Sequence, residues 1–205
     1  HIVVMMENPY GGNSPGRLDY YLWPFLEKDL KDGVCTLEEA QELIEELFIR
    51  IDERIHTIDT WGETVVLGGS HPNGTSAVNP LSYMVVEGFM KYDITHPNVY
   101  CRLPKDCPQE FIDLSAKYLK DGQNRAQILN DESIMNALSK NGVAEDDACN
   151  YYCGGCMEVG VQSATSDLLF AGWHNIAKVV ELCITGGRSL TDGYVIQNRK
   201  YKSLF

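Results

Sequence analysis

The stretch that most constrains the fold of this protein is Cys149-Asn150-Tyr151-Tyr152-Cys153-Gly154-Gly155-Cys156-Met157-Glu158. Three cysteines fall within eight residues, and two glycines precede the last cysteine. Because glycine permits tight turns and positive φ, we expect the Cys156 thiol to stand at a loop tip. In extended backbone, residues i and i+2 point to the same side, so Glu158 should face the same cavity. A thiol beside a carboxylate suits chemistry in which sulfur carries a hydrogen atom and the carboxylate moves a proton.

Two other interpretations of this stretch stay open. Cysteine is among the most buried residue types, so the three cysteines could be small core residues. Their C-x3-C-x2-C spacing also matches the iron–sulfur loop of radical S-adenosylmethionine enzymes, so Cys149, Cys153 and Cys156 could form an iron–sulfur or zinc-binding module. The position of the stretch, about three-quarters along the chain, argues against such a cluster. A carboxylate at Glu158 would also add unwanted negative charge beside thiolate ligands, so we expect no metal here.

Composition narrows the class of protein. The chain has 205 residues, is 44% hydrophobic and carries a formal net charge of −12, so it can build one real core. The negative charge argues against nucleic-acid and membrane-surface partners, which are themselves polyanionic. No stretch approaches the ~20 apolar residues of a membrane span. Seven unevenly spaced cysteines fit reduced thiols and a cytoplasmic location better than a disulfide framework.

The order of strand-like and helix-like segments predicts an α/β fold with parallel strands. Short apolar runs bounded by turn residues indicate three strands, at 64–69, 97–103 and 126–131. Helical spacing and start signals indicate helices over 36–51, 84–90, 108–121 and 131–138. The first of these helices begins with a capping box, in which Thr36 is the N-cap and Glu39 is at N3.

Several polar and special residues have ordinary structural interpretations. Pro24 should limit the regularity of any helix in the aromatic-rich segment around it. We expect Arg17 and Asp19 to form a structural ion pair. The spacing of Lys178 and Glu181, one turn apart, predicts a pair on a helix surface.

The finger Gly155-Cys156-Met157-Glu158 resembles the Gly-Cys-Val-Glu loop of the glycyl radical enzymes, the family that includes pyruvate formate-lyase and choline and glycerol lyases. Other blocks resemble the same family in order and spacing, so the resemblance covers roughly residues 13–205. They are residues 13–21, 71–83, 96–98, 106–111, 130–132, 142–143 and 174–182. Asn73 and Ser76 stand where the family pattern has aspartates, and this departure keeps a degenerate, non-catalytic homologue open as an alternative.

This resemblance implies the fold and the roles of particular residues. The expected fold is part of the family's α/β barrel, with half-barrel strands, surrounding helices and a central cysteine finger loop. Cys156 would be the thiyl radical residue and Glu158 the general base or acid. His174 lies on an otherwise apolar predicted helix near this loop, so from the sequence it is either a buried core residue or a substrate contact. Because pyruvate formate-lyase has no such glutamate, Glu158 favours the eliminase and decarboxylase branches. Val159 replaces a proline common in eliminases, so the branch stays open.

The resemblance also implies a missing part and several partners. The family's Arg-Val-x-Gly-Tyr type motif does not occur here, so we expect residues 1–205 to be an internal fragment of the catalytic domain, inactive alone, without the C-terminal glycyl radical segment. The complete protein would carry a glycyl radical installed by an S-adenosylmethionine-dependent activase. It would form a homodimer and cleave or dehydrate a small polar metabolite in an anaerobic cytoplasm.

Overall fold

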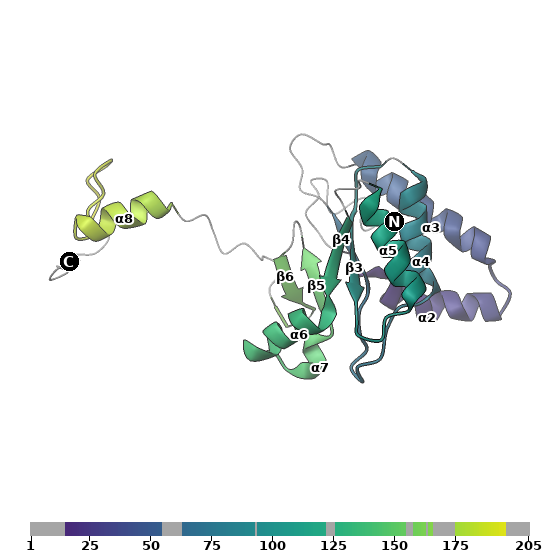
Figure 1. Cartoon of the computed structure of the whole chain (residues 1–205). Coiled ribbons are helices and arrows are strands. Elements are labelled where there is room, and N and C mark those ends of the chain that lie inside the picture. The colour runs from purple at the N-terminus through teal and green to yellow at the C-terminus, as the bar shows by residue number, and fades with distance from the viewer. Residues whose placement is uncertain are drawn as a thin grey trace. The chain divides into compact units, whose positions relative to one another are not determined.

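The computed structural model describes residues 15–54, 63–92, 94–121, 126–154, 158–162, 164–165 and 175–195. The chain divides into two compact units, His1–Leu169 and Phe170–Phe205. The described helices and strands of the first unit are, in chain order, β1 (Gly16–Arg17), α2 (Leu18–Lys31), α3 (Leu37–Arg54), β2 (Thr64–Gly68), α4 (Pro80–Lys91), β3 (Asn98–Leu103), α5 (Gln109–Lys120), β4 (Ala126–Asn130), α6 (Asp131–Lys140), α7 (Glu145–Ala148), β5 (Tyr151–Gly154) and β6 (Glu158–Val161) (Figure 1). In the second unit the described helix is α8 (Ile176–Ile184).

Strands β1 to β4 form one sheet in consecutive order, and every pairing in it is parallel. The three strands predicted from apolar runs are confirmed as β2, β3 and β4. The two residues of β1 were not predicted as a strand, because two residues are too few to show alternation. Helices fill each crossover, as parallel strands require.

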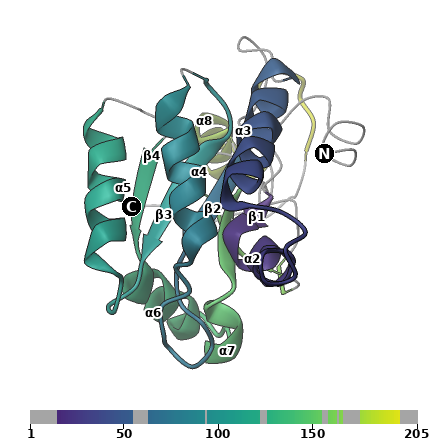
Figure 2. The ribbon, with the colours of Figure 1, turned by 90° about the vertical axis from the view of Figure 1, so that its right-hand side faces the viewer.

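Helices α2 to α5 lie on one face of this sheet (Figure 2). Residues two apart in β2 and β3 point toward these helices, as the period of a strand dictates. The side chains that form this core are Val65, Leu67, Val99 and Cys101 from the strands and Phe48, Leu81, Val85, Phe89, Phe111 and Tyr118 from the helices. This helix-covered face therefore holds the main hydrophobic core of the unit.

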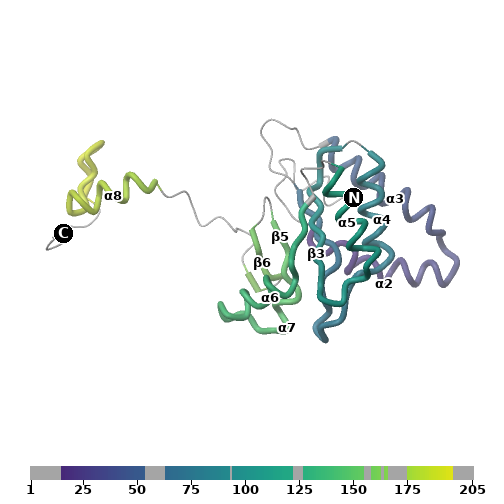
Figure 3. The backbone as a smooth tube through the Cα atoms, in the orientation of Figure 1, coloured from purple at the N-terminus to yellow at the C-terminus, as the bar shows by residue number. Residues whose placement is uncertain are grey.

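The opposite face of the sheet is covered by the antiparallel hairpin of β5 and β6 (Figure 3). The alternate strand residues Val66 and Tyr100 pack there against Tyr151, Cys153 and Val161. Side chains of α6 pack against the same cluster. The sheet thus carries helices on one side and the cysteine-bearing hairpin on the other.

Consecutive parallel strands with their crossover helices on one face are the arrangement of a barrel wall. A doubly wound sheet reverses its strand order and places helices on both faces, whereas a barrel keeps the order and places the helices outside. In such a wall the hairpin of β5 and β6 lies on the inner side.

The helix start signals in the sequence are largely confirmed. The backbone N–H of Thr36 donates to Glu39 Oε2 at 2.8 Å and the N–H of Glu39 donates to Thr36 Oγ1 at 3.2 Å, which is the predicted capping box. Pro108 is the N-cap of α5 rather than its first residue. Pro24 lies inside α2, which is 14 residues long and continues past the proline to Lys31. The apolar packing of Leu18, Trp23 and Leu26 on the core outweighs the loss of one backbone donor there.

The two positions that depart from the family pattern make local bonds in the loop before α4. Asn73 Oδ1 accepts hydrogen bonds from the N–H of Thr75 at 3.1 Å and from its hydroxyl at 2.7 Å. The hydroxyl oxygen of Ser76 accepts from the N–H of Val78 at 3.3 Å, and the Ser76 N–H donates to Asp106 at 3.0 Å. Both polar residues therefore stabilise the turn in which they stand.

In the second unit, Asn175 is the N-cap residue of α8, and its side chain accepts a hydrogen bond from the N–H of Lys178. The predicted pair between Lys178 and Glu181 is confirmed, with Nζ and Oε1 2.7 Å apart. Gly186 and Gly187 follow the helix with φ of 69° and 92°, a conformation in which glycine ends a helix at little cost.

Candidate functional site

The structure describes one of the three predicted site residues. Glu158 is the first residue of β6, is half-buried, and pairs across the hairpin with Gly154. Cys156 and His174 lie outside the described residues, so their expected positions stay predictions. Three residues, 155–157, join Gly154 to Glu158, and Cys156 is the middle one. The chain therefore carries Cys156 in the short connection at one end of an antiparallel hairpin.

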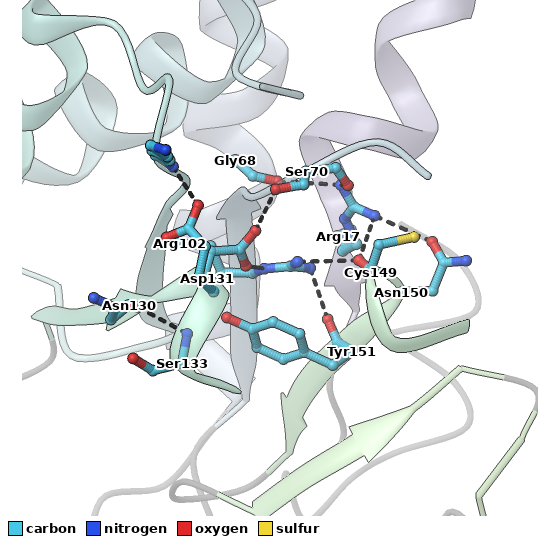
Figure 4. A network of polar contacts seen from close by, with 12 residues as sticks. Arg17, Gly68, Ser70, Arg102, Asn130, Asp131, Ser133, Cys149, Asn150 and Tyr151 are labelled. Atoms are coloured by element: carbon cyan, nitrogen blue, oxygen red, sulfur yellow. Dashed lines mark hydrogen bonds and ion pairs between the residues drawn. The ribbon is translucent and has the colours of Figure 1, made fainter. Parts of the chain in front are cut away.

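Side chains from three strands of the sheet hold the first strand of this hairpin and Cys149, which lies two residues before it. Arg17 of β1 and Arg102 of β3 both donate to the carbonyl oxygen of Cys149, each at 3.0 Å (Figure 4). Arg102 Nη1 also donates to the carbonyl of Tyr151 at 2.9 Å. The hydroxyl of Thr64 in β2 donates to the carbonyl of Cys153 at 2.6 Å.

Arg102 owes its orientation to a buried carboxylate at the start of α6. Its Nε lies 2.7 Å from Asp131 Oδ1, and both side chains are 0% exposed. Asp131 Oδ2 accepts a further bond of 2.6 Å from the hydroxyl of Ser70. The guanidinium also stacks on the ring of Tyr151, with Cζ 3.7 Å from the ring centroid. All of these contacts fix the guanidinium plane against the hairpin.

Arg17 and Asp19 do not form the predicted ion pair; they turn to different partners. Besides Cys149, Arg17 donates to the carbonyls of Gly68 at 3.3 Å and Ser70 at 3.1 Å, and to Asn150 Oδ1 at 3.1 Å. Asp19 instead accepts bonds from backbone N–H groups and one hydroxyl. The donors are the N–H of Tyr20, the N–H of Gly68 and the hydroxyl of Ser82. The ion pair was a wrong prediction because the strand-to-helix turn after Arg17 sends the two side chains to different neighbours.

The two described cysteines of the stretch are packed thiols. The Cys149 thiol donates to the carbonyl of Asp146 at 3.0 Å, and burial raises its pKa. Cys153 is 1% exposed within the cluster beneath the hairpin, and burial raises its pKa to about 11. In the described part of the chain, no group of three or more histidine, cysteine, aspartate or glutamate residues could hold a metal ion. Cys156, which the three-cysteine hypothesis requires, lies outside the described residues, so this hypothesis stays untested.

A glycine in the loop after β2 makes room for the Arg102 guanidinium. Gly69 has φ of +77°, and a Cβ there would lie 2.4 Å from Arg102 Cζ. We expect Gly69→Ala to destabilise the protein by about 2–4 kcal/mol, because backbone strain adds to displacement of a buried charge. Gly74→Ala is the matched control: Gly74 has φ of +80°, but nothing lies within 4 Å of such a Cβ. Thermal unfolding of both variants checks this, and equal losses of stability would contradict the role assigned to the arginine contact.

The sequence had not singled out Arg102, Asp131, Thr64 or Ser70 as part of this site. One signal was present, since an arginine inside an otherwise apolar strand must find buried partners. Because side chains alternate along β3, Arg102 points away from the helix-covered core that holds Cys101 and contacts Tyr151 of the hairpin. The sequence pattern could not identify the partners of Arg102, because they lie 29, 47 and 49 positions away along the chain.

The fold and the hairpin together define a class: a parallel α/β barrel with a cysteine-bearing hairpin on its inner face. The family model described as "Pyruvate formate lyase-like" matches residues 1–203, and the chain belongs to this family. The chain is 27% identical to an isethionate sulfite-lyase of Nitratidesulfovibrio vulgaris, over 88% of this chain and 23% of that protein. It is 28% identical to a trans-4-hydroxy-L-proline dehydratase of Clostridioides difficile, over 91% of this chain and 25% of that protein.

The solved structure of a glycyl radical enzyme from Archaeoglobus fulgidus is similar to this one, with a TM-score of 0.78 and 27% identity. The alignment covers 98% of this chain and 27% of that chain. The fold is therefore a portion of the glycyl radical enzyme barrel, as the resemblance implied. The chain spans about a quarter of the length of the curated relatives that it matches. None of the helices that the structure describes is long and apolar enough to cross a membrane.

Proposed function

We propose that the complete protein is a glycyl radical lyase in which Cys156 carries the hydrogen atom and Glu158 the proton. The observation that supports this most directly is the placement of the β5–β6 hairpin. Its three-residue connection contains Cys156, and the hairpin packs on the sheet face opposite the helices. In a closed barrel this face is the interior, from which water and oxygen are excluded, and radical chemistry requires that exclusion.

The proposed reaction uses the two residues in separate steps. A glycyl radical of the complete protein would first take the hydrogen atom of the Cys156 S–H group, which would leave the unpaired electron on sulfur. A hydrogen atom moves from a substrate carbon to the Cys156 sulfur, which forms an S–H bond and leaves the unpaired electron on carbon. Glu158 takes a proton from an adjacent hydroxyl or gives one to the leaving group, whose bond to carbon breaks with its electron pair. The product radical then takes the hydrogen atom back from Cys156.

The neighbouring cysteines support a thiol role for this stretch over a metal cluster. Cys149 uses its S–H as a hydrogen-bond donor, and Cys153 lies in an apolar cluster with a raised pKa. A ligand must be a thiolate, and both environments favour the protonated thiol. We also propose His174, which directly precedes the N-cap residue of α8, as a substrate contact, because an imidazole can both donate and accept hydrogen bonds.

The remaining parts of the proposal concern the complete protein. We place the glycyl radical loop outside residues 1–205, because no Arg-Val-x-Gly-Tyr type sequence occurs in them. A separate radical S-adenosylmethionine activase would install the radical, and the complete protein would be a homodimer of an anaerobic cytoplasm. Two of the relatives are named as a sulfite-lyase and a dehydratase, and both names favour elimination from a small polar metabolite.

Electron paramagnetic resonance on the activated complete protein tests the proposal, together with Glu158→Gln. That substitution keeps the size of the side chain and removes its basicity. We expect turnover to fall by about 10²–10⁴-fold, the usual contribution of a positioned acid or base, with an unchanged glycyl radical signal. Full turnover in the variant would refute the role of Glu158. Absence of any organic radical in the activated wild type would overturn the reaction class.

A further inference from the structure

Two positively charged side chains meet at the point where the hairpin is attached to the sheet. Two buried guanidinium groups, from Arg17 and Arg102, donate to the single carbonyl oxygen of Cys149 (Figure 4). Both side chains are 0% exposed. Burial, followed by the nearby charge of Arg102, lowers the pKa of Arg17. Bringing two like charges together inside a protein is unfavourable, so other contacts must compensate for it.

The compensating contacts make both arginines rigid. Asp131 pairs with Arg102, and the carbonyls of Gly68 and Ser70 accept from Arg17. Each guanidinium also lies over an aromatic ring, at 4.1 Å from the Tyr20 centroid for Arg17 and at 3.7 Å from the Tyr151 centroid for Arg102. A guanidinium with this many directional contacts has little rotational freedom.

The acceptors on the hairpin side follow a regular pattern. They are the carbonyl of Cys149, which caps α7 just before the hairpin, and those of Tyr151 and Cys153, residues i and i+2 of β5, which point to the same side of an extended strand. Each donor comes from a different strand, because Arg17, Thr64 and Arg102 belong to β1, β2 and β3. Side chains from three neighbouring strands of the sheet therefore fix the position of the hairpin through hydrogen bonds to backbone carbonyls.

We infer that Arg17, Thr64 and Arg102 are positioning residues that set where the Cys156 sulfur stands. This inference rests on the proposed function. The last anchored carbonyl, that of Cys153, is three residues from Cys156, and three residues span at most about 10 Å. Hydrogen transfer needs reacting atoms about 3–3.5 Å apart, and a displacement of about 1 Å costs about 10²-fold in rate. A hairpin that positions the Cys156 sulfur with that accuracy must itself be held rigidly against the sheet.

Thr64 offers the sharpest test, because Thr64→Val removes the donor with little change of shape and Thr64→Ser keeps it. In the complete, activated protein we expect Thr64→Val to lower kcat by about 10–100-fold, with KM and glycyl radical yield within about twofold of wild type. Hydrogen exchange of the backbone amides in residues 151–161 should accelerate about tenfold in that variant. Thr64→Ser should restore both kcat and protection. Ser115→Ala, which removes a buried hydroxyl from α5 on the helical face, should leave hairpin exchange and kcat unchanged.

The outcomes separate this inference from the proposed function. Unchanged kcat and unchanged hairpin exchange in Thr64→Val would overturn the positioning role. Faster exchange spread over the whole sheet would also overturn it, because it would indicate a general loss of stability. If the wild type forms no glycyl radical, the proposed function fails, and the exchange measurement alone still decides whether Thr64 fixes the hairpin.

Discussion

Replacing Cys156 with serine is expected to reduce turnover by at least about 10⁴-fold while the glycyl radical still forms on activation. An S–H bond is close enough in strength to a substrate C–H bond for reversible hydrogen transfer, whereas an O–H bond is considerably stronger. Each factor of ten corresponds to about 1.4 kcal/mol in the barrier, so this loss corresponds to about 5–6 kcal/mol. The measurements are steady-state turnover under anaerobic conditions and the amplitude of the radical signal.

Cys153→Ala is the matched control for this prediction. Cys153 belongs to the same hairpin, but its side chain is buried in the cluster with Val66 and Tyr151. Removing its sulfur should leave a small cavity that destabilises the protein, and should lower turnover by no more than about tenfold. The metal-cluster hypothesis would be favoured instead by a different outcome. Variants of Cys149, Cys153 and Cys156 would then lose comparable activity, and each would bind less iron or zinc than the wild type.

Replacing Arg102 with methionine is expected to produce the largest loss of stability among single substitutions in this site. Methionine fills similar space but leaves the Asp131 carboxylate buried without its partner. The carbonyl of Tyr151 also loses the donor that Arg102 supplies, and that of Cys149 loses one of two. Breaking a buried ion pair by removing one partner typically costs about 3–5 kcal/mol.

Arg50→Met provides the control for the arginine substitution. Arg50 pairs with Glu53 at 2.9 Å on the surface of α3, and its side chain is 48% exposed. An exposed pair contributes only about 0–1 kcal/mol, so this variant should unfold close to the wild type temperature. Thermal unfolding followed by circular dichroism compares the two. Similar shifts for Arg50→Met and Arg102→Met would contradict the energetic role that we assign to the buried network.

Local features of the fold could be predicted because their causes lie within a few residues of one another. The helix at Thr36 starts where a hydroxyl and a carboxylate three residues apart cap each other's backbone. The strands β2, β3 and β4 are short apolar runs bounded by turn residues, and their alternation with helices implies parallel pairing. The glycines before Cys156 and the similarity of the finger to a family motif indicated the candidate site and the barrel.

The attachment of the candidate site to the barrel wall was decided only by the tertiary structure. Arg17 reaches a carbonyl 132 positions away and Arg102 reaches carbonyls 47 and 49 positions away. Every residue has a carbonyl group, so nothing in the sequence marks which ones will accept these bonds. The expected pair of Arg17 and Asp19 shows the same limit, since proximity along the chain suggested a partner that neither side chain takes. Contacts between side chains and distant backbone depend on how strands and hairpin stack, and that stacking exists only once the chain has folded.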